Sequence, residues 1–524
     1  MHVAIRADAS EVMGTGHLMR CAALARAIKK RGAAVTFVCR NLPATLSAFV
    51  KNQGFGVCLL PHSGSGAGSA QGYEAWLGAP WETDALQTVS ALETEGAVDW
   101  LIVDHYGIDF RWEERLRTAG CRILVIDDLA IQRHACDLLL NQNLIASVHD
   151  RYRNLIPEYC RLLAGPQFAL LRQEFHASRM SLNRGSEQVG NLLVFLGGAD
   201  PDGVTLRVLK VVDGIRSNEL QVTAILGAAN PHGETIKRLY GQRSGYKVIS
   251  QVASMAELMV QADLAIGAGG ISTWERSCLG LPAIIIAIAE NQVEVSRTAA
   301  EAGACLYLGA ATSLSDEELA AGLSVMISSA SLRKSVSRAC LELVDGLGCE
   351  RVATEMLLEP VRVRRARADD AERVFSWRNA EETRRRAHDP SPLSIEKHLE
   401  WFRHTLADDK RVLLIGEIES GPIGVLRYDV LEHVATVSVY LDPTRYGHGY
   451  GTALLMEGER WLRSFRPDVS CLRAEIRPDN LASRRAFAKS GFLECGTLLE
   501  KPMHKLVSPE FNSPVCEHDE TLEG

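Results

Sequence analysis

The N-terminal stretch of the chain reads Val3-Ala4-Ile5-Arg6-Ala7-Asp8-Ala9-Ser10-Glu11-Val12-Met13-Gly14-Thr15-Gly16-His17. A short aliphatic strand at Val3–Ile5 is followed by a loop with two glycines and by a helix that begins near His17. Glycines allow a close approach of the backbone, and a helix N-terminus offers unpaired N–H groups and the positive end of its dipole. The stretch therefore predicts a βα unit whose loop, with Gly14 and Gly16, binds a phosphate or a developing anion.

Further βα units are expected across the first 310 residues, because short apolar runs alternate there with helix-length amphipathic segments. The predicted strands of a first series are Val3–Ile5, Val35–Cys39, Leu101–Asp104, Ile123–Ile126 and Leu138–Leu140. After the polar stretch 181–188, the predicted strands of a second series are Leu192–Leu196, Val222–Leu226, Lys247–Ile249, Leu264–Ile266 and Ala283–Ile288. The predicted fold class is α/β, with two Rossmann-like halves that face each other across a cleft.

The pattern changes at Pro360, after a predicted helical stretch 331–358. A strand at 361–365, two helices and strands at 412–418, 423–429 and 435–441 indicate a third, α+β domain. The predicted divisions are 1–180 and 181–358 for the two halves, 361–506 for the third domain and 507–524 for a flexible tail. The Gly- and Ser-rich segment 63–72 is expected to be a solvated loop.

Composition excludes several classes of function. Of the 524 residues 46% are hydrophobic and 23% charged, which is typical of soluble globular proteins. The 57 Lys and Arg residues are outnumbered by 65 Asp and Glu residues, so binding to nucleic acid would lack its main electrostatic contribution. The longest apolar stretch, 281–289, is far below the roughly 18 residues that span a bilayer. We expect neither nucleic acid nor a membrane as a partner.

The cysteines favour a reducing compartment. All 13 are scattered singly without a C-x-x-C pair, and the sequence offers no metal-ligand spacing. We therefore expect a cytoplasmic protein without a disulfide framework and without a metal. The oligomeric state is left open by the sequence.

His17 stands at the mouth of the first loop, where a histidine that titrates near neutrality would act as a general base on water. A tight turn with a helix-capping histidine is the alternative that this motif alone leaves open. Polar groups also follow two strands of the first half, in the runs Asp104-His105-Tyr106-Gly107 and Asp127-Asp128. Ligands of such sheets bind at these strand ends.

The second half has a glycine run of its own. Gly267-Ala268-Gly269-Gly270-Ile271-Ser272-Thr273-Trp274-Glu275 follows an apolar strand and opens a helix, so its backbone donors are expected to face a diphosphate. In nucleotide-sugar enzymes with two such halves, a carboxylate placed like Glu275 accepts hydrogen bonds from ribose hydroxyls. Asn291 and Gln292 are expected to face the same cleft. Arg172, before the second half, is expected either to hold an anion or to be a solvated surface residue.

These motifs occur together in one known family. In chain order they are Ile5-Arg6-Ala7-Asp8, Gly14-Thr15-Gly16-His17 with Arg20, Asp104-His105-Tyr106-Gly107, Phe168–Phe175, Gly197-Gly198-Ala199-Asp200 and Asn291-Gln292. Roughly residues 1–345 resemble the UDP-2,4-diacetamido-2,4,6-trideoxy-β-L-altropyranose hydrolases of pseudaminic acid biosynthesis. The resemblance implies a glycosyltransferase-B-like fold in which water replaces the sugar acceptor and UDP leaves from the anomeric carbon.

The same resemblance implies roles for individual residues. His17 is the expected catalytic base, and Asp8 and Tyr106 are expected to line the sugar site. The other expected substrate-binding residues are Gly14, Gly16, Arg172, Gly270, Ser272, Thr273, Glu275, Asn291 and Gln292. It implies no metal.

The third domain carries two motifs of a different kind. A glycine-rich turn, Arg445-Tyr446-Gly447-His448-Gly449-Tyr450-Gly451-Thr452, follows a strand and opens a helix, which aims backbone N–H groups at a diphosphate. Further along, a strand that ends at Glu475 is followed by Asn480 at a turn and by a helix that closes with Gly491-Phe492. Together the motifs resemble the GCN5-related N-acetyltransferases, the GNAT family, over residues 361–506.

This second resemblance implies acetyl-CoA as the cosubstrate. The residues expected to bind it are Gly447, His448, Gly449, Tyr450, Gly451 and Thr452 at the pyrophosphate and Asn480 near the pantetheine arm. Two positions depart from the family's pattern. Tyr446 stands where a basic residue or a glutamine is usual, and Phe487 stands where many members have the tyrosine that protonates the CoA thiolate.

A phenyl ring donates no proton, so water or another side chain must replace that tyrosine, or the domain is impaired. Glu475 and His433 are the candidate bases for the incoming amine. Trp377-Arg378-Asn379 and the run 394–402 resemble the GNAT member that acetylates the 4-amino group of the UDP-linked sugar.

The hypothesis is a bifunctional enzyme that acetylates a UDP-4-amino-sugar and then hydrolyses the product to UDP and the free sugar. Its expected partners are small molecules, a UDP-sugar and acetyl-CoA. One alternative is a glycosyltransferase whose GNAT domain acts on another amine. The other is a nucleotide-sugar sensor.

Overall fold

The computed structural model describes residues 1–10, 13–61, 72–180, 182, 187–215, 219–227, 229–250, 252, 254–357, 359–387, 389–447, 449–495 and 498–503. The chain divides into two compact units, Met1–Leu357 and Leu358–Gly524. The solvated loop predicted over 63–72 lies outside the described residues except for Gly72, and so does the predicted tail from 507.

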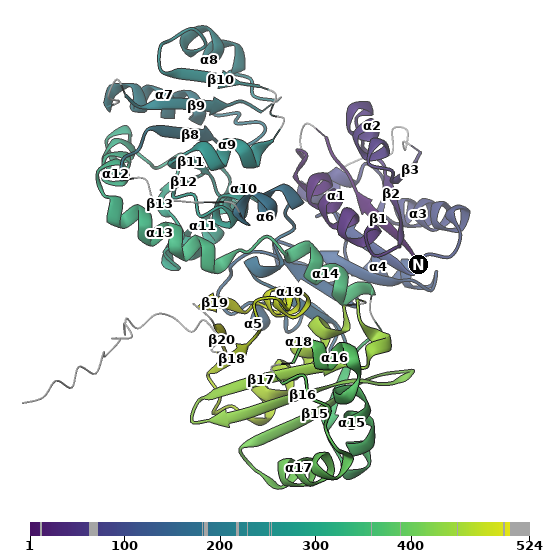
Figure 1. The fold of residues 1–524 in the computed structure, drawn as a ribbon. Coiled ribbons are helices and arrows are strands. Elements are labelled where there is room, and N and C mark those ends of the chain that lie inside the picture. Colours follow the sequence, from purple (N-terminus) through teal and green to yellow (C-terminus); the bar gives the residue numbers. More distant parts are fainter. Residues whose placement is uncertain are drawn as a thin grey trace, which may run out of the picture. The chain divides into compact units, whose positions relative to one another are not determined.

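The first half of the first unit is a seven-stranded parallel sheet in the order β3-β2-β1-β4-β5-β6-β7 (Figure 1). The strands are β1 His2–Ala7, β2 Ala34–Cys39, β3 Gly56–Leu59, β4 Trp100–Asp104, β5 Arg122–Ile126, β6 Leu138–Asn141 and β7 Arg161–Ala164. All five predicted strands are present. β3 and β7 were not predicted because they are short edge strands, mostly half-buried or exposed, and lack a continuous apolar run.

Helices pack around this sheet. They are α1 Gly16–Lys29, α2 Ala44–Asn52, η1 Gly72–Leu77, α3 Trp81–Glu95, α4 Phe110–Arg117, α5 Val148–Tyr152, η2 Pro166–Phe168 and α6 Gln173–Met180. The first of them follows β1 directly, so the predicted βα unit at the N-terminus is confirmed.

The second half is a six-stranded parallel sheet in the order β10-β9-β8-β11-β12-β13. Its strands are β8 Asn191–Phe195, β9 Gln221–Ile225, β10 Tyr246–Ile249, β11 Leu264–Ala268, β12 Ala283–Ala287 and β13 Leu306–Ala310. Its helices are α7 Val204–Ile215, α8 Gly233–Tyr240, α9 Met255–Gln261, α10 Ser272–Cys278, η3 Glu290–Gln292, α11 Val293–Glu301, α12 Asp316–Ser328 and α13 Ala330–Leu343. Leu192 and Val194 enter one apolar core and Leu193 another, so the sheet is buried on both faces.

The helical stretch predicted over 331–358 is interrupted at 344–347, and its second part is α14, Gly348–Leu357. This helix packs against α1 of the first half. Arg31 donates hydrogen bonds of 3.0 Å to the carbonyl of Glu350 and to Thr354 Oγ1. The end of the first unit thus returns to its beginning.

The second unit contains a mixed seven-stranded sheet in the order β14-β15-β16-β17-β18-β20-β19 (Figure 1). The strands are β14 Arg362–Arg365, β15 Arg411–Ile418, β16 Gly421–Leu431, β17 Val434–Leu441, β18 Cys471–Glu475, β19 Leu493–Cys495 and β20 Leu498–Pro502. The helices are η4 Ala368–Asp370, α15 Ala371–Asn379, α16 Glu381–Arg385, α17 Ile395–Ala407, η5 Pro443–Arg445, α18 Tyr450–Phe465 and α19 Leu481–Lys489. The parallel strands β17 and β18 pair from Val434–Cys471 to Thr436–Arg473 and then part.

Candidate active site

A cleft opens at the carboxyl ends of the strands of the first unit. Its lining from the first half consists of Met13, Gly16, His17, Arg20, Tyr106, Asp128, Leu129, Gln142 and Asn143. Its lining from the second half consists of Gly269, Gly270, Ile271, Asn291, Gln292 and Val295. Loops that follow strands of both sheets therefore share one site, as is usual for ligands of such folds.

His17 is paired with a buried carboxylate. It lies in the first turn of α1, and its Nδ1 is 2.6 Å from Oδ1 of Asp104, the last residue of β4. Burial alone would raise the pKa of Asp104, but Arg20 and His17 lower it well below the usual range. An ionised carboxylate only accepts hydrogen bonds, so Nδ1 carries the hydrogen of the neutral ring and Nε2 is the basic nitrogen.

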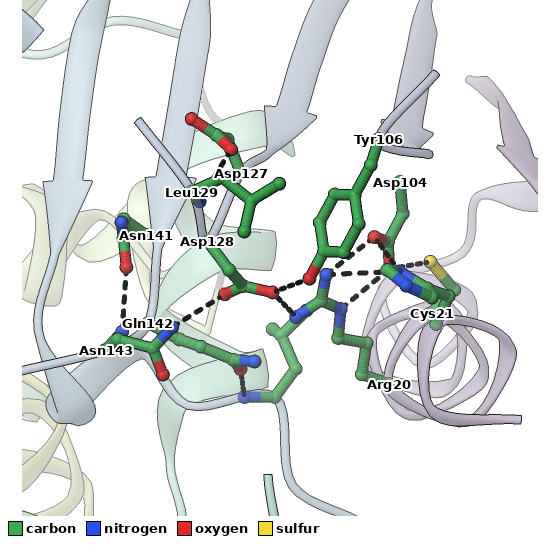
Figure 2. A network of polar contacts seen from close by, with 12 residues as sticks. Arg20, Cys21, Asp104, Tyr106, Asp127, Asp128, Leu129, Asn141, Gln142 and Asn143 are labelled. Carbon is green, nitrogen blue, oxygen red and sulfur yellow. Dashed lines mark hydrogen bonds and ion pairs between the residues drawn. The ribbon is translucent and has the colours of Figure 1, made fainter. Parts of the chain in front are cut away.

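Arg20 joins two carboxylates behind His17. Its Nε and Nη2 donate to both oxygens of Asp104 at 2.7 and 2.6 Å, and its Nη1 donates to Oδ2 of Asp128 at 2.5 Å. The same oxygen of Asp128 accepts a hydrogen bond of 2.9 Å from Tyr106. Figure 2 shows Arg20 between Asp104 on one side and Asp128 with Tyr106 on the other. The loops after β4 and β5 are thus held to α1 by paired charges.

Aromatic rings gather beside His17. Its ring centroid is 4.7 Å from that of Tyr106 and 6.5 Å from that of Trp76. Tyr73 completes the cluster, with centroids 4.9 Å from Trp76 and 5.1 Å from Tyr106. Tyr73 and Trp76 belong to η1 and were not predicted as site residues, because they follow a Gly- and Ser-rich segment that was read as solvated.

In the second half, Gln292 fixes the glycine loop. Its Oε1 accepts hydrogen bonds from the backbone N–H groups of Gly269 and Ile288, at 3.2 and 3.1 Å. A Cβ at Gly269 would lie 2.1 Å from Ser296 Oγ, whereas one at Gly270 would meet no atom within 4 Å. The loop is therefore packed tightly on one side and open on the other.

Ser272 and Thr273 turn inward from this loop. Arg276 donates to Ser272 Oγ at 3.1 Å, to Thr273 Oγ1 at 3.2 Å and to the carbonyl of Ala268 at 2.8 Å. Burial lowers the pKa of Arg276 to about 10, and no described carboxylate forms an ion pair with it. Both hydroxyls, which were predicted to contact substrate, brace the loop from its interior side.

Glu275 and Arg172 lie beside each other. Arg172 donates to Glu275 Oε1 at 3.4 Å and pairs with Glu174 at 3.0 Å. Burial raises the pKa of Glu275 in spite of Arg172. The two predicted substrate residues are brought together, although neither belongs to the lining of the cleft.

Asp8 does not reach the cleft. It is 1% exposed, and its Oδ1 accepts hydrogen bonds from the backbone of Arg40 and Asn41 at 2.7 and 3.1 Å. Arg6 lies 2.9 Å from the same oxygen, and His105 Nε2 lies 3.5 Å from the other. Asp8 is not in the lining of the cleft because its carboxylate pairs with the fully buried Arg6, and its role at the sugar site stays a prediction.

In the second unit the glycine-rich turn leads from β17 into α18. Gly447 and Gly449 have φ values of 82° and 93°, in the left-handed region that favours glycine. Gly449 is the N-cap of α18, and the predicted residues Tyr450, Gly451 and Thr452 form its first turn. His448, predicted beside them, lies outside the described residues.

Asn480 caps the other helix at this end of the sheet. Its Oδ1 accepts a hydrogen bond of 3.1 Å from the backbone N–H of Ser483, in the first turn of α19. Because α18 follows β17, α19 follows β18 and the two strands are parallel, both helix N-termini lie where the strands part. The turn and Asn480 are therefore brought to one end of the sheet.

The two candidate bases lie at opposite ends of the parted strands. Glu475 is the last residue of β18 and is exposed. His433 lies in the turn before β17, where its Nδ1 is 2.9 Å from the carbonyl of Asp468. Phe487 is buried against Phe492, with ring centroids 4.9 Å apart.

Two families match parts of the chain. Residues 192–344 match the Glycosyltransferase family 28 C-terminal domain, and residues 361–493 match the Acetyltransferase (GNAT) domain. The Bacillus subtilis protein YwnH, provisionally named a phosphinothricin acetyltransferase, is 31% identical over 116 residues, which are 21% of this chain and 68% of YwnH. The third domain belongs to the GNAT family. The predicted GNAT domain is confirmed.

The first unit has relatives of its own. The spore coat polysaccharide biosynthesis protein SpsG of Bacillus subtilis is 29% identical over 355 residues, covering 67% of this chain and 96% of SpsG. The UDP-2,4-diacetamido-2,4,6-trideoxy-β-L-altropyranose hydrolase of Campylobacter jejuni is 27% identical over 271 residues, covering 51% of this chain and 84% of the hydrolase. The chain thus combines a part similar to these proteins with a GNAT domain.

The structure brings half of the predicted first-unit residues into the lining of one cleft. His17, Gly16, Tyr106, Gly270, Asn291 and Gln292 line the cleft, and Gly14 shapes its loop with a φ of 74°. Asn143 also lines it but was not predicted, and Arg20 and Asp128, which stand in motifs noted in the sequence, line it without having been assigned a role. Arg20 stands three residues after His17, on the same helix face, which is the signal that would have revealed it.

The described part of the chain contains neither a cluster of metal-ligating side chains nor a helix suited to span a membrane. No group of three or more His, Cys, Asp or Glu side chains converges there in a way that could hold a metal ion. None of its helices has both the length and the apolar character needed to cross a membrane.

Proposed function

We propose that the first unit hydrolyses a UDP-linked amino sugar and that the GNAT domain N-acetylates the precursor of that sugar. The hydrolase activity is inferred chiefly from the His17–Asp104 pair, which lies at a cleft lined by both halves. The name of the Campylobacter jejuni relative, a UDP-2,4-diacetamido-2,4,6-trideoxy-β-L-altropyranose hydrolase, supports this class of substrate.

His17 acts as the general base on water. With Nδ1 donating to Asp104, Nε2 accepts a proton from a water molecule whose oxygen attacks C1 of the sugar. The bond between C1 and the diphosphate oxygen breaks, and its electron pair leaves with UDP. Asp104 stabilises the imidazolium that forms, as the carboxylate of a hydrolytic triad does. A general base of this kind accelerates a reaction typically about 10²- to 10⁴-fold.

The second half holds the departing UDP. Successive backbone N–H groups form an anion site without basic side chains, and the loop at Gly269 and Gly270 has its open side free of steric obstruction. Gln292 keeps that loop in position through its two backbone contacts. Glu275, on α10 beyond the lining of the cleft, accepts hydrogen bonds from the ribose hydroxyls of a UDP that extends past that lining, and Arg172 orients its carboxylate.

The aromatic cluster of Tyr73, Trp76 and Tyr106 packs against the sugar. Rings offer an apolar face and a polar edge or hydroxyl, which suits a deoxy sugar with a methyl group and acetamido substituents. The cluster lies next to His17, so the ring of the bound sugar would present C1 to the base.

The GNAT domain takes acetyl-CoA at the end of the sheet where β17 and β18 part. The N-terminus of α18, behind Gly447 and Gly449, offers unpaired N–H groups to the pyrophosphate. The unpaired edges of the parted strands suit the amides of the pantetheine arm, and Asn480 lies at the same end. In the reaction the sugar amine forms a C–N bond to the acetyl carbon, the thioester C–S bond breaks, and the thiolate takes up a proton from water or a polar side chain.

The two activities are consecutive in this proposal. Acetylation of the 4-amino group of the UDP-linked sugar comes first, and hydrolysis of the diacetamido product follows. Fusion of the two catalysts in one chain supports this order, because the product of one domain is the substrate of the other. A small-molecule cosubstrate and a small-molecule substrate are then the partners of the protein.

A glycosyltransferase is the second candidate. The match of residues 192–344 to the Glycosyltransferase family 28 C-terminal domain favours it. In that case the proton acceptor would serve a sugar hydroxyl rather than water, and UDP release would need an acceptor.

One experiment separates these functions. The full chain is given acetyl-CoA and the UDP-4-amino-sugar without any acceptor, and free CoA thiol and UDP are followed together. The hydrolase requires release of both. UDP that appears only after an acceptor is added would establish the transferase instead.

Two variants assign each activity to its unit. His17→Ala should release CoA at the wild-type rate and lose UDP release. Gly449→Val, which strains a backbone with φ of 93°, should lose CoA release but still hydrolyse substrate that is already acetylated. Equal UDP release by His17→Ala and wild type would remove His17 from the mechanism.

A further inference from the structure

Asn143 forms one polar bridge between the two halves at the cleft, in addition to the ion pair between Arg151 and Glu294. It follows β6 in the first half, and its Oδ1 accepts a hydrogen bond of 3.1 Å from the indole Nε1 of Trp274 in α10 of the second half. Its Nδ2 donates a hydrogen bond of 3.0 Å to Oδ1 of Asp128. Its backbone N–H donates to Asn141 Oδ1 at 2.9 Å, so the bridging residue is itself anchored.

The chemistry of the two partners requires a carboxamide at this position. An indole N–H only donates, and a carboxylate only accepts. Asn143 therefore has to present its oxygen to Trp274 and its nitrogen to Asp128, which fixes the orientation of the amide. An aspartate of the same shape would keep the first contact and set two carboxylates against each other at the second.

The bridge continues to the catalytic base. Asp128 presents its other oxygen to Arg20, and Arg20 holds both oxygens of Asp104. Asp104 in turn holds Nδ1 of His17. Figure 2 shows the central part of this series, with Asp128 between Asn143 and Arg20. Every link is a hydrogen bond between side chains.

The other end of the bridge lies in the nucleotide half. Trp274 is fully buried in α10, three residues after the glycine loop that closes with Ile271. The loop and Trp274 belong to one rigid turn, because Trp274 N–H donates to the carbonyl of Ile271 at 3.0 Å. A displacement of the loop by a bound diphosphate would therefore move the indole N–H.

We propose that Asn143 is a positioning residue that transmits occupation of the glycine loop by UDP to the orientation of His17. The inference rests on the proposed function, since it takes the loop as the UDP site and His17 as the base. With UDP bound, the bridge holds Asp128, Arg20 and Asp104 in the arrangement that presents Nε2 of His17 to water. Without the bridge, nucleotide still binds but the base is poorly aligned.

The kinetic test compares Asn143→Asp and Trp274→Phe with wild type. Both should lower kcat for UDP release, by about 10²-fold and 10-fold, because small displacements of a catalytic group have effects of this size. The Kd for UDP should stay within about threefold. In Asn143→Asp the added negative charge should also move the acidic limb of the kcat profile to higher pH. Weaker UDP binding at unchanged kcat would overturn the proposal.

A double-mutant cycle tests whether the two residues act in series. Asn143→Ala and Trp274→Phe combined should be no slower than Asn143→Ala alone. Multiplicative losses would mean that the residues act independently and would contradict the bridge. Trp274→Phe keeps the buried ring, so it remains informative should Asn143→Ala fail to fold.

A binding experiment keeps this inference separate from the proposed reaction. UDP alone is added to ¹⁵N-histidine-labelled full-length protein, and the ring resonances of His17, assigned with His17→Gln, are followed by NMR. UDP should shift them in wild type and shift them much less in Trp274→Phe at saturating UDP. Equal shifts in both proteins would overturn the coupling, whereas failure of UDP to bind at all would count against the proposed function.

Discussion

The two halves of the first unit line one cleft with different kinds of residues and contacts. The first half uses buried charge pairs, in which Arg20 holds Asp104 and Asp128 at the cleft and Arg6 meets Asp8 and Asp84 behind it. The second half uses glycines and amides around its loop. In the proposed function, fixed ionic partners suit the half that orients the proton acceptor, and open backbone suits the half that receives an anion.

The largest effect is expected from removing a charge pair in the first half. Asp104→Asn should lower kcat for UDP release by on the order of 10³-fold or more, because the carboxylate that sets the His17 tautomer is lost. The Kd for UDP should remain near that of wild type, since the second half is untouched. Single-turnover UDP release and UDP titration measure the two quantities.

Asp109→Asn is the matched control in the same half. Asp109 caps α4 through a hydrogen bond to Arg111 N–H, a contact that asparagine preserves. Its activity should equal that of wild type. An Asp104→Asn variant within tenfold of wild type would show that the pair with His17 does not serve the chemistry.

A smaller effect, mainly on UDP binding and less on kcat, is expected from a change in the glycine loop of the second half. Gly269→Ala places a Cβ 2.1 Å from Ser296 Oγ, so the loop must shift. The Kd for UDP should rise by about 10-fold, with a smaller change in kcat. Isothermal titration with UDP checks the first quantity and steady-state kinetics the second.

Ser296→Ala should rescue this variant. The Ser296 hydroxyl has no hydrogen-bond partner in the described structure, so its removal alone should be nearly neutral. Combined with Gly269→Ala, it should restore most of the UDP affinity. A double variant as weak as Gly269→Ala would mean that the loop is not limited by this contact.

An effect of a different kind concerns stability and pH. His134 Nδ1 lies 2.7 Å from Glu113 Oε1 in the first half. Burial would lower the pKa of His134, but Glu113 and Asp127 raise it from 6.5 to about 10. The stabilisation is fully present below pH 6.5 and is lost as the pH rises through 10. The free energy of unfolding should fall with rising pH between pH 7 and 9, by on the order of 1 kcal/mol per pH unit.

Hydrogen exchange resolves this slope for each half, after correction for the intrinsic exchange rate. Peptides of β5 and β6 should lose protection with rising pH more steeply than peptides of β11 and β12. His134→Gln should flatten the slope of the first half. Equal slopes in both halves of the wild type would contradict the assignment.

Local sequence patterns predicted the architecture well. Strands such as Leu101–Asp104 and the glycine loops before His17 and after β11 were found where apolar runs and turn residues place them, because these signals act over a few residues. Edge strand β3 was not predicted, because it is only partly buried. The packing of α14 against α1 was not predicted either, because the contacting residues Arg31 and Glu350 are 319 residues apart in the sequence.

The partners of site residues were harder to predict than the residues themselves. His17 was predicted as a base, but its pairing with Asp104 depends on the parallel register of β1 and β4. Asp8 directly follows β1 and Asp104 ends β4, yet the carboxylate of Asp8 pairs with the buried guanidinium of Arg6. A sequence motif alone does not reveal which of these two carboxylates pairs with His17.

The most direct measurement determines which product receives the oxygen atom of the attacking water molecule. The full chain hydrolyses the diacetamido UDP-sugar in H₂¹⁸O without an acceptor, and mass spectrometry reads the label in UDP. Attack on C1 activated by His17 predicts UDP that carries no ¹⁸O and a wild-type rate that His17→Ala loses. Labelled UDP, or no UDP without an acceptor, would contradict hydrolysis at the anomeric carbon.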